Sequence, residues 1–254
     1  MPQGTNIGAA YILATLPEAK RTALGPDEPM TIGEVAREFG ITLRALRFYE
    51  AKRLIAPQRS GALRLYRRGD RNRIALILTN LGETFNRLGD STKAIAMLKQ
   101  AEDLADELGD KLGLAEAVRG LGKAYLARRE YTKARECTQR AVDLFKETES
   151  RVQLGVALRS LGEVTAAGSA GGAGQREATE HLKQSIAIFE EVGNEVELAR
   201  SCRAYAELLR QTPEHSHNPA IASEASLLSR RAEEIFAKMR ASAGGLGGEA
   251  LFAR

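Results

Sequence analysis

The chain has 254 residues, of which 28% are charged, with a formal net charge of +4, no tryptophan and two cysteines. Aromatic residues make up only 5% and helix formers dominate, which favours packed helices over a β-sandwich. No apolar run reaches membrane-span length, no secretory signal is visible, and two distant cysteines do not indicate structural disulfides, so we expect a cytoplasmic protein that does not enter a membrane.

The positive charge is concentrated in one short segment. Residues 30–73 contain 11 Lys and Arg against 4 Asp and Glu, a net +7, whereas residues 1–29 carry −1 and residues 74–254 carry −2. A localised positive block is expected where a protein binds a polyanion, although a solvated surface would have the same composition.

The two ends of the chain have little pattern. Residues 1–29 are rich in Gly, Ala and Pro, and we expect a disordered or loosely held extension there. Residues 242–254 are glycine-rich and are predicted to form a flexible tail.

The segment from residue 30 to residue 73 predicts two short helices separated by a tight turn. Thr31 and Glu34 have the spacing of a capping box, and Gly40 is placed to end the first helix. Only one further residue separates Gly40 from Thr42, a favourable N-cap for the second helix. This spacing is typical of a helix-turn-helix.

The second helix is expected to recognise DNA. Leu43 and Leu46 are predicted to point inward, while Arg44, Arg47 and Phe48 share another face at spacings of three and four residues. Exposed arginines beside an aromatic ring suit a DNA groove, because the guanidinium fork matches phosphates and guanine edges.

Residues 57–66 are predicted to form a short β-hairpin. Its arms carry Arg59 and Arg64, and the pattern lets Leu63 and Leu65 face inward.

Together, residues 32–36, 42–50, 52–57 and 64–66 with Asp70 resemble the winged helix-turn-helix of the MerR family of transcription regulators. The resemblance implies that the second helix enters the major groove of double-stranded DNA and that the hairpin, or wing, grips the neighbouring backbone. By position, the residues expected to contact bases or phosphates are Thr42, Arg44, Arg47, Phe48, Tyr49, Lys52, Arg59, Arg64 and Tyr66.

The chain then departs from that family. The family continues into a second helical pair and a long helix that forms an antiparallel coiled-coil dimer, but here the sequence changes after residue 78. Homodimerisation and the family's activation by DNA distortion are therefore open. A winged segment used only for packing or for binding a protein is the alternative.

Residues 74–241 contain an internal repeat. Leu81-Gly82, Leu121-Gly122 and Leu161-Gly162 recur at a spacing of 40 residues, and Tyr205-Ala206 marks a fourth, degenerate copy. Each copy predicts two antiparallel amphipathic helices whose small residues allow close contact. The pattern resembles the tetratricopeptide repeat in its longer form, which implies stacked hairpins with a concave groove.

The predicted fold class is therefore mainly α, with a small winged helix-turn-helix followed by an α-solenoid of about four tetratricopeptide-type hairpins. One helix over residues 70–88 is expected to be shared by the two parts.

The repeat family's geometry places four basic residues in the groove: Arg119, Lys123, Arg159 and Arg203. Such residues are candidates for binding an acidic peptide or another anion. Alternatively, Arg159 and Arg203 each form an ion pair with the glutamate four residues later, which leaves Arg119 and Lys123 as the favoured contacts.

No catalytic constellation is apparent. Cys137 and Cys202 occupy helix-packing positions of the repeat, and the glycine-rich residues 168–174 lack the Lys-Ser/Thr of a phosphate loop. His215 and His217 lie in a proline-bounded loop without further ligands at suitable spacing. The sequence therefore predicts no enzyme, no metal and no cofactor.

Two functions remain open. The chain is predicted to be a transcription regulator whose repeats bind an effector, peptide or protein partner, or mediate oligomerisation. The alternative is an interaction scaffold in which the winged segment binds a partner or tethers the protein non-specifically to DNA.

Overall fold

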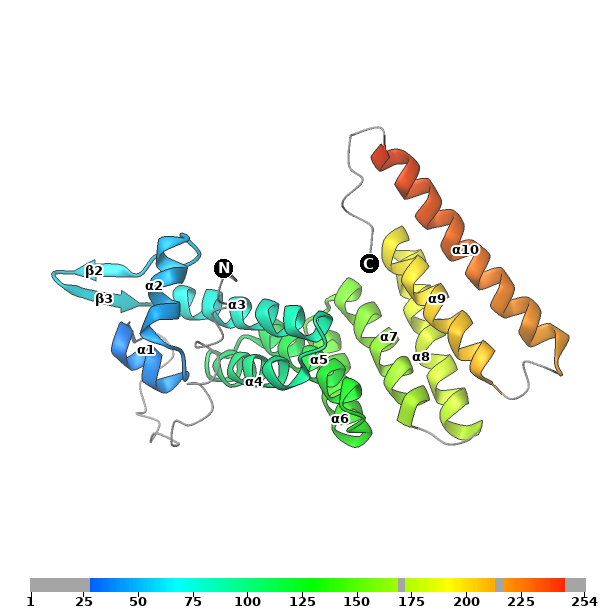
Figure 1. Cartoon of the computed structure of the whole chain (residues 1–254), viewed down its shortest axis with the longest axis horizontal. Helices are drawn as coiled ribbons and strands as arrows, with labels where there is room; N and C mark the ends of the chain where they lie inside the picture. Colours follow the sequence, from blue (N-terminus) through cyan, green and yellow to red (C-terminus); the bar gives the residue numbers. More distant parts are fainter. Residues whose placement is uncertain (1–27, 169–171, 213–216, 245–254) are drawn as a thin grey trace, which may run out of the picture. The chain divides into compact units, whose positions relative to one another are not determined.

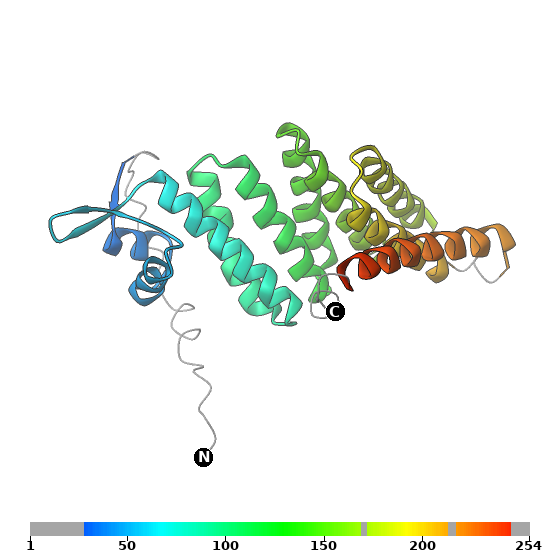
Figure 2. The same ribbon diagram turned by 90° about the horizontal axis from the view of Figure 1, so that it is seen from above.

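The computed structural model describes residues 28–168, 172–212 and 217–244, which form ten helices and three short strands (Figures 1 and 2). The chain divides into two compact units, residues 1–127 and residues 128–254. Apart from residues 28–29 and 242–244, the predicted extension and tail lie outside the described residues.

The first unit begins with a segment that we call the winged segment, residues 30–66. Its three strands form an antiparallel sheet in the order β1-β3-β2. The β2–β3 hairpin was predicted, whereas the pairing of β1 with β3 was not. The elements are β1 (Met30–Thr31), α1 (Ile32–Glu38), α2 (Leu43–Ala51), β2 (Gln58–Ser60) and β3 (Leu63–Tyr66).

Local side-chain hydrogen bonds fix both helix starts, as the sequence predicts. The Thr31 hydroxyl accepts a hydrogen bond from the Glu34 amide at 3.3 Å, and the Glu34 carboxylate accepts one from the Thr31 amide at 2.6 Å. The Thr42 hydroxyl accepts one from the Ala45 amide at 3.1 Å. Gly40 has φ +61° in the turn between the helices, a conformation that favours glycine.

Three longer helices follow in this unit: α3 (Arg68–Arg87), α4 (Ser91–Glu107) and α5 (Lys111–Ala127). The predicted shared helix is confirmed, because α3 runs without a break from the wing into the first repeat, and Figure 2 shows this continuity. Asp70 lies in its first turn, where the carboxylate accepts hydrogen bonds from the Arg67 amide at 3.2 Å and the Ala56 amide at 3.1 Å. Asp70 therefore ties the helix start to the loop after α2.

The winged segment and the first repeat share one hydrophobic core. It combines buried residues of α1, α2 and β3 with residues of α3, α4 and α5. Leu46 belongs to this core, but Leu43 is 43% exposed, so the prediction that Leu43 points inward was wrong. The core comprises Met30, Val35, Phe39, Ile41, Leu46, Tyr49, Ile55, Tyr66, Ile74, Ala75, Leu78, Ala101, Leu104, Leu108 and Ala117.

The second unit consists of helices packed in sequence order, with contacts between each helix and the next. Gly162 allows the close approach that the repeat predicts, since a Cβ there would lie 2.8 Å from Cγ of Leu182. The fold class predicted from the sequence is confirmed: the chain is mainly α, with a winged helix-turn-helix followed by tetratricopeptide-type hairpins. The helices of this unit are α6 (Tyr131–Glu147), α7 (Arg151–Gly168), α8 (Gly172–Glu191), α9 (Glu195–Gln211) and α10 (Pro219–Gly244).

Candidate nucleic-acid interface

Helix α2 has a core face and an outer face. Leu46 and Tyr49 are buried, at 0% and 8% exposure, whereas Arg44, Arg47 and Phe48 are exposed. Within residues 28–127, neither arginine has a hydrogen-bond or ion-pair partner in the structure. The outer face therefore presents two guanidinium groups beside an aromatic ring, as the sequence predicts.

Basic residues continue beyond the end of α2. The Lys52 ammonium lies 5.8 Å from the centre of the Phe48 ring, and Lys52 is exposed. Arg53 is also exposed and has φ +57°, a left-handed conformation that ends the helix. Arg53 was not predicted from the sequence, because a dipeptide such as Lys52-Arg53 does not show which side chain a turn will project outward.

The face of β3 that packs inward differs from the prediction. Leu63 is 55% exposed, Leu65 is half-buried and Tyr66 is fully buried, so the face of β3 that enters the core is that of Arg64 and Tyr66. Alternation along a strand identifies two faces but not which of them is covered. The expectation that Leu63 faces inward was therefore wrong.

Glu50, in the last turn of α2, explains which face is covered. Its carboxylate accepts a hydrogen bond from Arg64 Nε at 2.8 Å and another from the Tyr66 hydroxyl. Burial and the Glu50 carboxylate raise the pKa of Tyr66, so the phenol stays protonated and donates. Figure 1 shows the hairpin beside α2. Glu50 was also missed, because nothing in the local sequence identifies partners 14 and 16 residues away.

Two of the predicted DNA contacts thus belong to the core. Tyr49 and Tyr66 are buried, and burial raises the pKa of the Tyr49 phenol. The Thr42 hydroxyl caps α2. The predicted residues that present exposed side chains are Arg44, Arg47, Phe48, Lys52 and Arg59, and Arg64 is partly exposed.

The arginines predicted for the repeat groove bridge neighbouring helices within each unit. Arg119 is 9% exposed, and its guanidinium lies 2.7 Å from the carboxylates of both Glu83 and Glu116. Arg159 lies 2.6 Å from the Glu197 carboxylate on α9, rather than pairing with the glutamate four residues later.

Lys123 and Arg203 are the other two residues of that prediction. Lys123 is half-buried on α5. Arg203 is exposed, and its guanidinium lies 5.7 Å from the centre of the Phe236 ring. Arg203 therefore stacks near an aromatic ring, whereas the predicted partner Glu207 lies 3.7 Å from Arg210.

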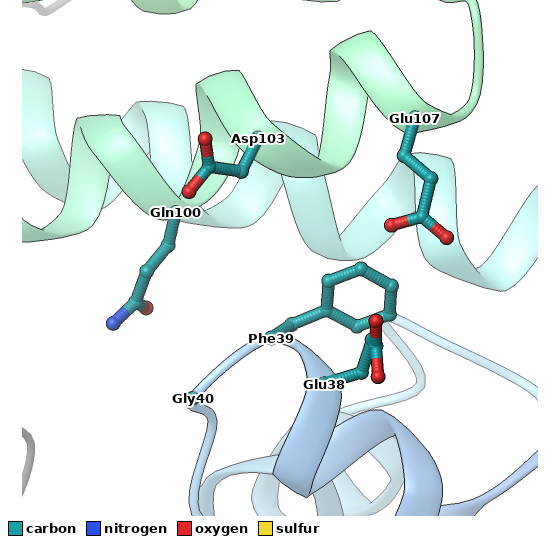
Figure 3. A pocket seen from close by; sticks show the side chains of 6 residues that line it. All are labelled: Glu38, Phe39, Gly40, Gln100, Asp103 and Glu107. Atoms are coloured by element: carbon teal, nitrogen blue, oxygen red, sulfur yellow. The ribbon is translucent and has the colours of Figure 1, made fainter. Parts of the chain in front are cut away.

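A hollow of about 200 Å³ lies between the winged segment and the first repeat. Figure 3 shows side chains of α4 facing the end of α1 across it. Carboxylates and a glutamine amide line it around one aromatic ring, but no group of three or more His, Cys, Asp or Glu within the described ranges is arranged to hold a metal ion. The lining residues are Glu38, Phe39, Gly40, Gln100, Asp103 and Glu107.

The two cysteines and His217 differ in burial. Cys202 is fully buried, as its repeat position predicts, and burial raises the pKa of its thiol. Cys137 is half-buried, His217 is exposed, and His215 lies outside the described residues. None of the helices in the part of the chain that the structure describes combines the length and apolarity that a membrane crossing requires.

Two protein families match separate parts of the chain. The MerR family regulatory protein model matches residues 31–66, and the tetratricopeptide repeat model matches residues 73–147. Both resemblances read from the sequence are confirmed. No curated protein matches the chain.

Solved structures resemble the chain in fold at low sequence identity. The crystal structure of BtubC (BKLC) from P. vanneervenii has a TM-score of 0.50 at 13% identity, over 88% of this chain and 84% of BtubC. A set of nearly identical TPR-like repeats from Podosopora anserina has a TM-score of 0.44 at 20% identity, over 67% of this chain and 95% of that one. At these identities, the first similarity shows the repeat fold alone.

Proposed function

We propose that this chain, in which a MerR-type winged helix-turn-helix precedes tetratricopeptide repeats, is a cytoplasmic, non-enzymatic transcription regulator that binds double-stranded DNA. The observation that carries the proposal is the outer face of α2. Arg44, Arg47 and Phe48 are exposed there while the opposite face is held in a core. A rigid helix with exposed arginines is the form that major-groove recognition requires.

The exposed basic residues divide into two proposed roles. Arg44 lies in the first turn of α2 and Arg47 in its middle, and both are proposed to contact base edges or nearby phosphates. Lys52, Arg53 and Arg59 lie at the end of α2 and in the wing, and are proposed to contact phosphates. The net +7 of residues 30–73 supports this assignment.

The test compares two double variants with the same charge loss. Arg44→Ala with Arg47→Ala is expected to weaken binding to DNA upstream of the chain's own gene by at least about tenfold. Lys99→Ala with Arg240→Ala removes two exposed cations outside the winged segment and should bind as the wild type does. Equal affinities and salt slopes for both double variants would overturn the proposal.

The repeats are proposed to bind a protein or peptide partner, or to bring two copies of the chain together. One winged segment makes few base contacts, and high specificity normally comes from paired half-sites. The described residues after β3 form a repeat hairpin instead of the MerR family's dimer helix. Solution mass measured with and without DNA tests this role, since a mass of two chains on one DNA site supports pairing.

The sequence predicts that four basic residues of the groove contact a partner. We propose that Arg119 and Arg159 do not make this contact. Arg119 and Arg159 each hold carboxylates of neighbouring helices, so an anionic peptide would have to displace those partners. Arg203 has an exposed side chain, unlike Arg119, Lys123 and Arg159, and is the better candidate for contact. Variants of Arg203 should therefore affect partner binding without unfolding the repeats.

A scaffold role is the second candidate, and one observation favours it. The MerR match spans residues 31–66, and the chain from residue 73 matches the tetratricopeptide repeat instead, so the winged segment is joined directly to an interaction module. Footprinting on the upstream DNA separates the candidates. A protected site with two-fold symmetry supports the regulator, whereas absent or diffuse protection supports the scaffold.

A further inference from the structure

We propose that Glu50 is a positioning residue that fixes the wing against the recognition helix, and that Arg64 and Tyr66 serve this attachment rather than contacting DNA. The DNA-binding consequence of this inference rests on the proposed function.

Both carboxylate oxygens of Glu50 are occupied by groups of one strand. Oε1 accepts from the Tyr66 hydroxyl and Oε2 accepts from Arg64 Nε at 2.8 Å. Arg64 and Tyr66 are two residues apart on β3, so they lie on the same face of the sheet. One side chain of α2 thus holds two successive inward-facing side chains of the wing.

The position of Glu50 in its helix indicates that its contacts with β3 have a structural role. The carboxylate lies in the last turn of α2, where the partial negative charge of the helix end disfavours an acid. Its side chain is also only 16% exposed. A largely covered acid at a helix C-terminus is stabilised by a nearby cation, and Arg64 supplies it.

The ion pair between Glu50 and Arg64 also determines which wing arginine is available to DNA. Arg59 and Arg64 are directly opposite each other on β2 and β3, and like charges in such positions repel. Glu50 balances the charge of Arg64, which leaves Arg59 as the exposed cation of the pair. We therefore assign the phosphate contact to Arg59 and the attachment to Arg64.

Apart from Glu50, the wing is held by the pairing of β3 with β1 and by a hydrogen bond that Arg67 Nε donates to Gln58 Oε1 at 3.0 Å. All three residues of β2 are exposed, and so is Leu63 at the start of β3. Tyr66 is the fully buried end of that strand. Removing the Tyr66 hydroxyl or the Arg64 guanidinium should therefore loosen the hairpin while the core of α1, α2 and α3 persists.

Hydrogen exchange of the full-length chain tests the attachment without DNA. Tyr66→Phe and Arg64→Met are each expected to raise exchange in residues 58–66 by about tenfold, the effect of losing one hydrogen bond to a charged group. Tyr205→Phe is the matched control, because Tyr205 is also buried and donates to a glutamate, Glu224, at 3.0 Å in the second unit. It should leave exchange in residues 58–66 unchanged.

DNA affinity measured at several salt concentrations then separates attachment from contact. Arg59→Met should reduce the steepness of the salt dependence by about 0.9, the value for one lost phosphate contact. Arg64→Met and Tyr66→Phe should weaken binding by about threefold to tenfold with the salt dependence unchanged.

Two results would overturn the inference. One is a reduction of the salt dependence by Arg64→Met equal to that caused by Arg59→Met. The other is wild-type exchange in residues 58–66 of both Tyr66→Phe and Arg64→Met. If the wild-type chain does not bind DNA, the proposed function fails, and the exchange measurement still decides whether Glu50 holds the wing.

Discussion

Arg119 on α5 donates a hydrogen bond to the Glu83 carboxylate on α3, with 2.7 Å between Nη2 and Oε1. The same guanidinium contacts Glu116 at 2.7 Å. Burial disfavours the charge of Arg119, but the carboxylates of Glu116 and Glu83 more than offset this and raise its pKa. The pair therefore joins the first helices of two successive repeats.

Arg119→Met should destabilise the chain by about 2 kcal/mol, because Glu83 and Glu116 lose the cation that compensates their charge. The cost stays moderate because both carboxylates are partly exposed and can be hydrated. Arg203→Met is the matched control at the equivalent repeat position, where the side chain is exposed, and should cost less than about 1 kcal/mol. Urea unfolding measures both. Equal costs would mean that the Arg119–Glu83 pair does not stabilise the repeats.

The close packing of Leu98 against Gly82 leads to a second prediction about stability. A Cβ at Gly82 would lie 2.4 Å from Cγ of Leu98, and one at Gly120 would lie 2.7 Å from Cδ2 of the same leucine. Leu98 is therefore packed between two glycines, so a shift away from one brings it closer to the other. Gly82→Ala should cost about 1–3 kcal/mol, the range for overpacking a core.

The control for this variant is Gly33→Ala, because nothing lies within 4 Å of a Cβ at Gly33 on α1. Alanine there should be neutral or stabilise the chain by up to about 1 kcal/mol through helix propensity. Thermal unfolding compares the two substitutions. A neutral Gly82→Ala would show that α3 and α4 can separate without loss of packing.

Local features of this fold could be predicted from the sequence because their causes are local. Thr31 and Thr42 cap their helices through amides three residues away. The repeat spacing likewise marks where helices approach closely, as Gly162 shows.

Features that depend on distant partners could not be predicted. Glu50 decides which face of β3 is covered, yet its partners come from another element. Arg159 pairs with Glu197, 38 residues later, although Glu163 lies at the favourable helical spacing. Charge and periodicity limit the candidates for a contact, but only the packing of the elements selects among them.

The common core of the first unit predicts that the winged segment and the first repeat unfold together. Leu104 on α4 is fully buried in the core that also contains Leu46 and Tyr49 of α2. Leu104→Ala should cost about 2–5 kcal/mol and should raise hydrogen exchange in α2 as well as in α4.

Phe145→Ala is the control for this coupling. Phe145 is fully buried on α6 in the second unit, so its loss should destabilise that unit by about 3–5 kcal/mol. Exchange in α2 should then stay as in the wild type. If Leu104→Ala also leaves α2 unchanged, the winged segment folds independently of the repeats.

His181 on α8 predicts a pH dependence of stability in the second unit. Its side chain is 17% exposed, the Glu177 carboxylate lies 3.6 Å from Nε2, and neither ring nitrogen has a hydrogen-bond partner among the residues described. Burial lowers the pKa of His181 below its ordinary value of 6.5, while Glu177 acts in the opposite direction and Arg135 reinforces the decrease.

The sign of the effect follows from this decrease. Below pH 6.5 the unfolded chain binds a proton at His181 that the folded chain resists, so this residue makes stability fall as the pH drops from 6.5 toward the folded-state pKa. Well above pH 6.5 both states are neutral at this position and the contribution is constant. His181→Met, which introduces the residue found at the equivalent position 97, should remove this contribution. Urea midpoints at pH 7.5 and pH 5.5 measure it: the wild type should lose more stability than His181→Met between these values, and equal losses would show that His181 is protonated as readily in the folded chain as in the unfolded one.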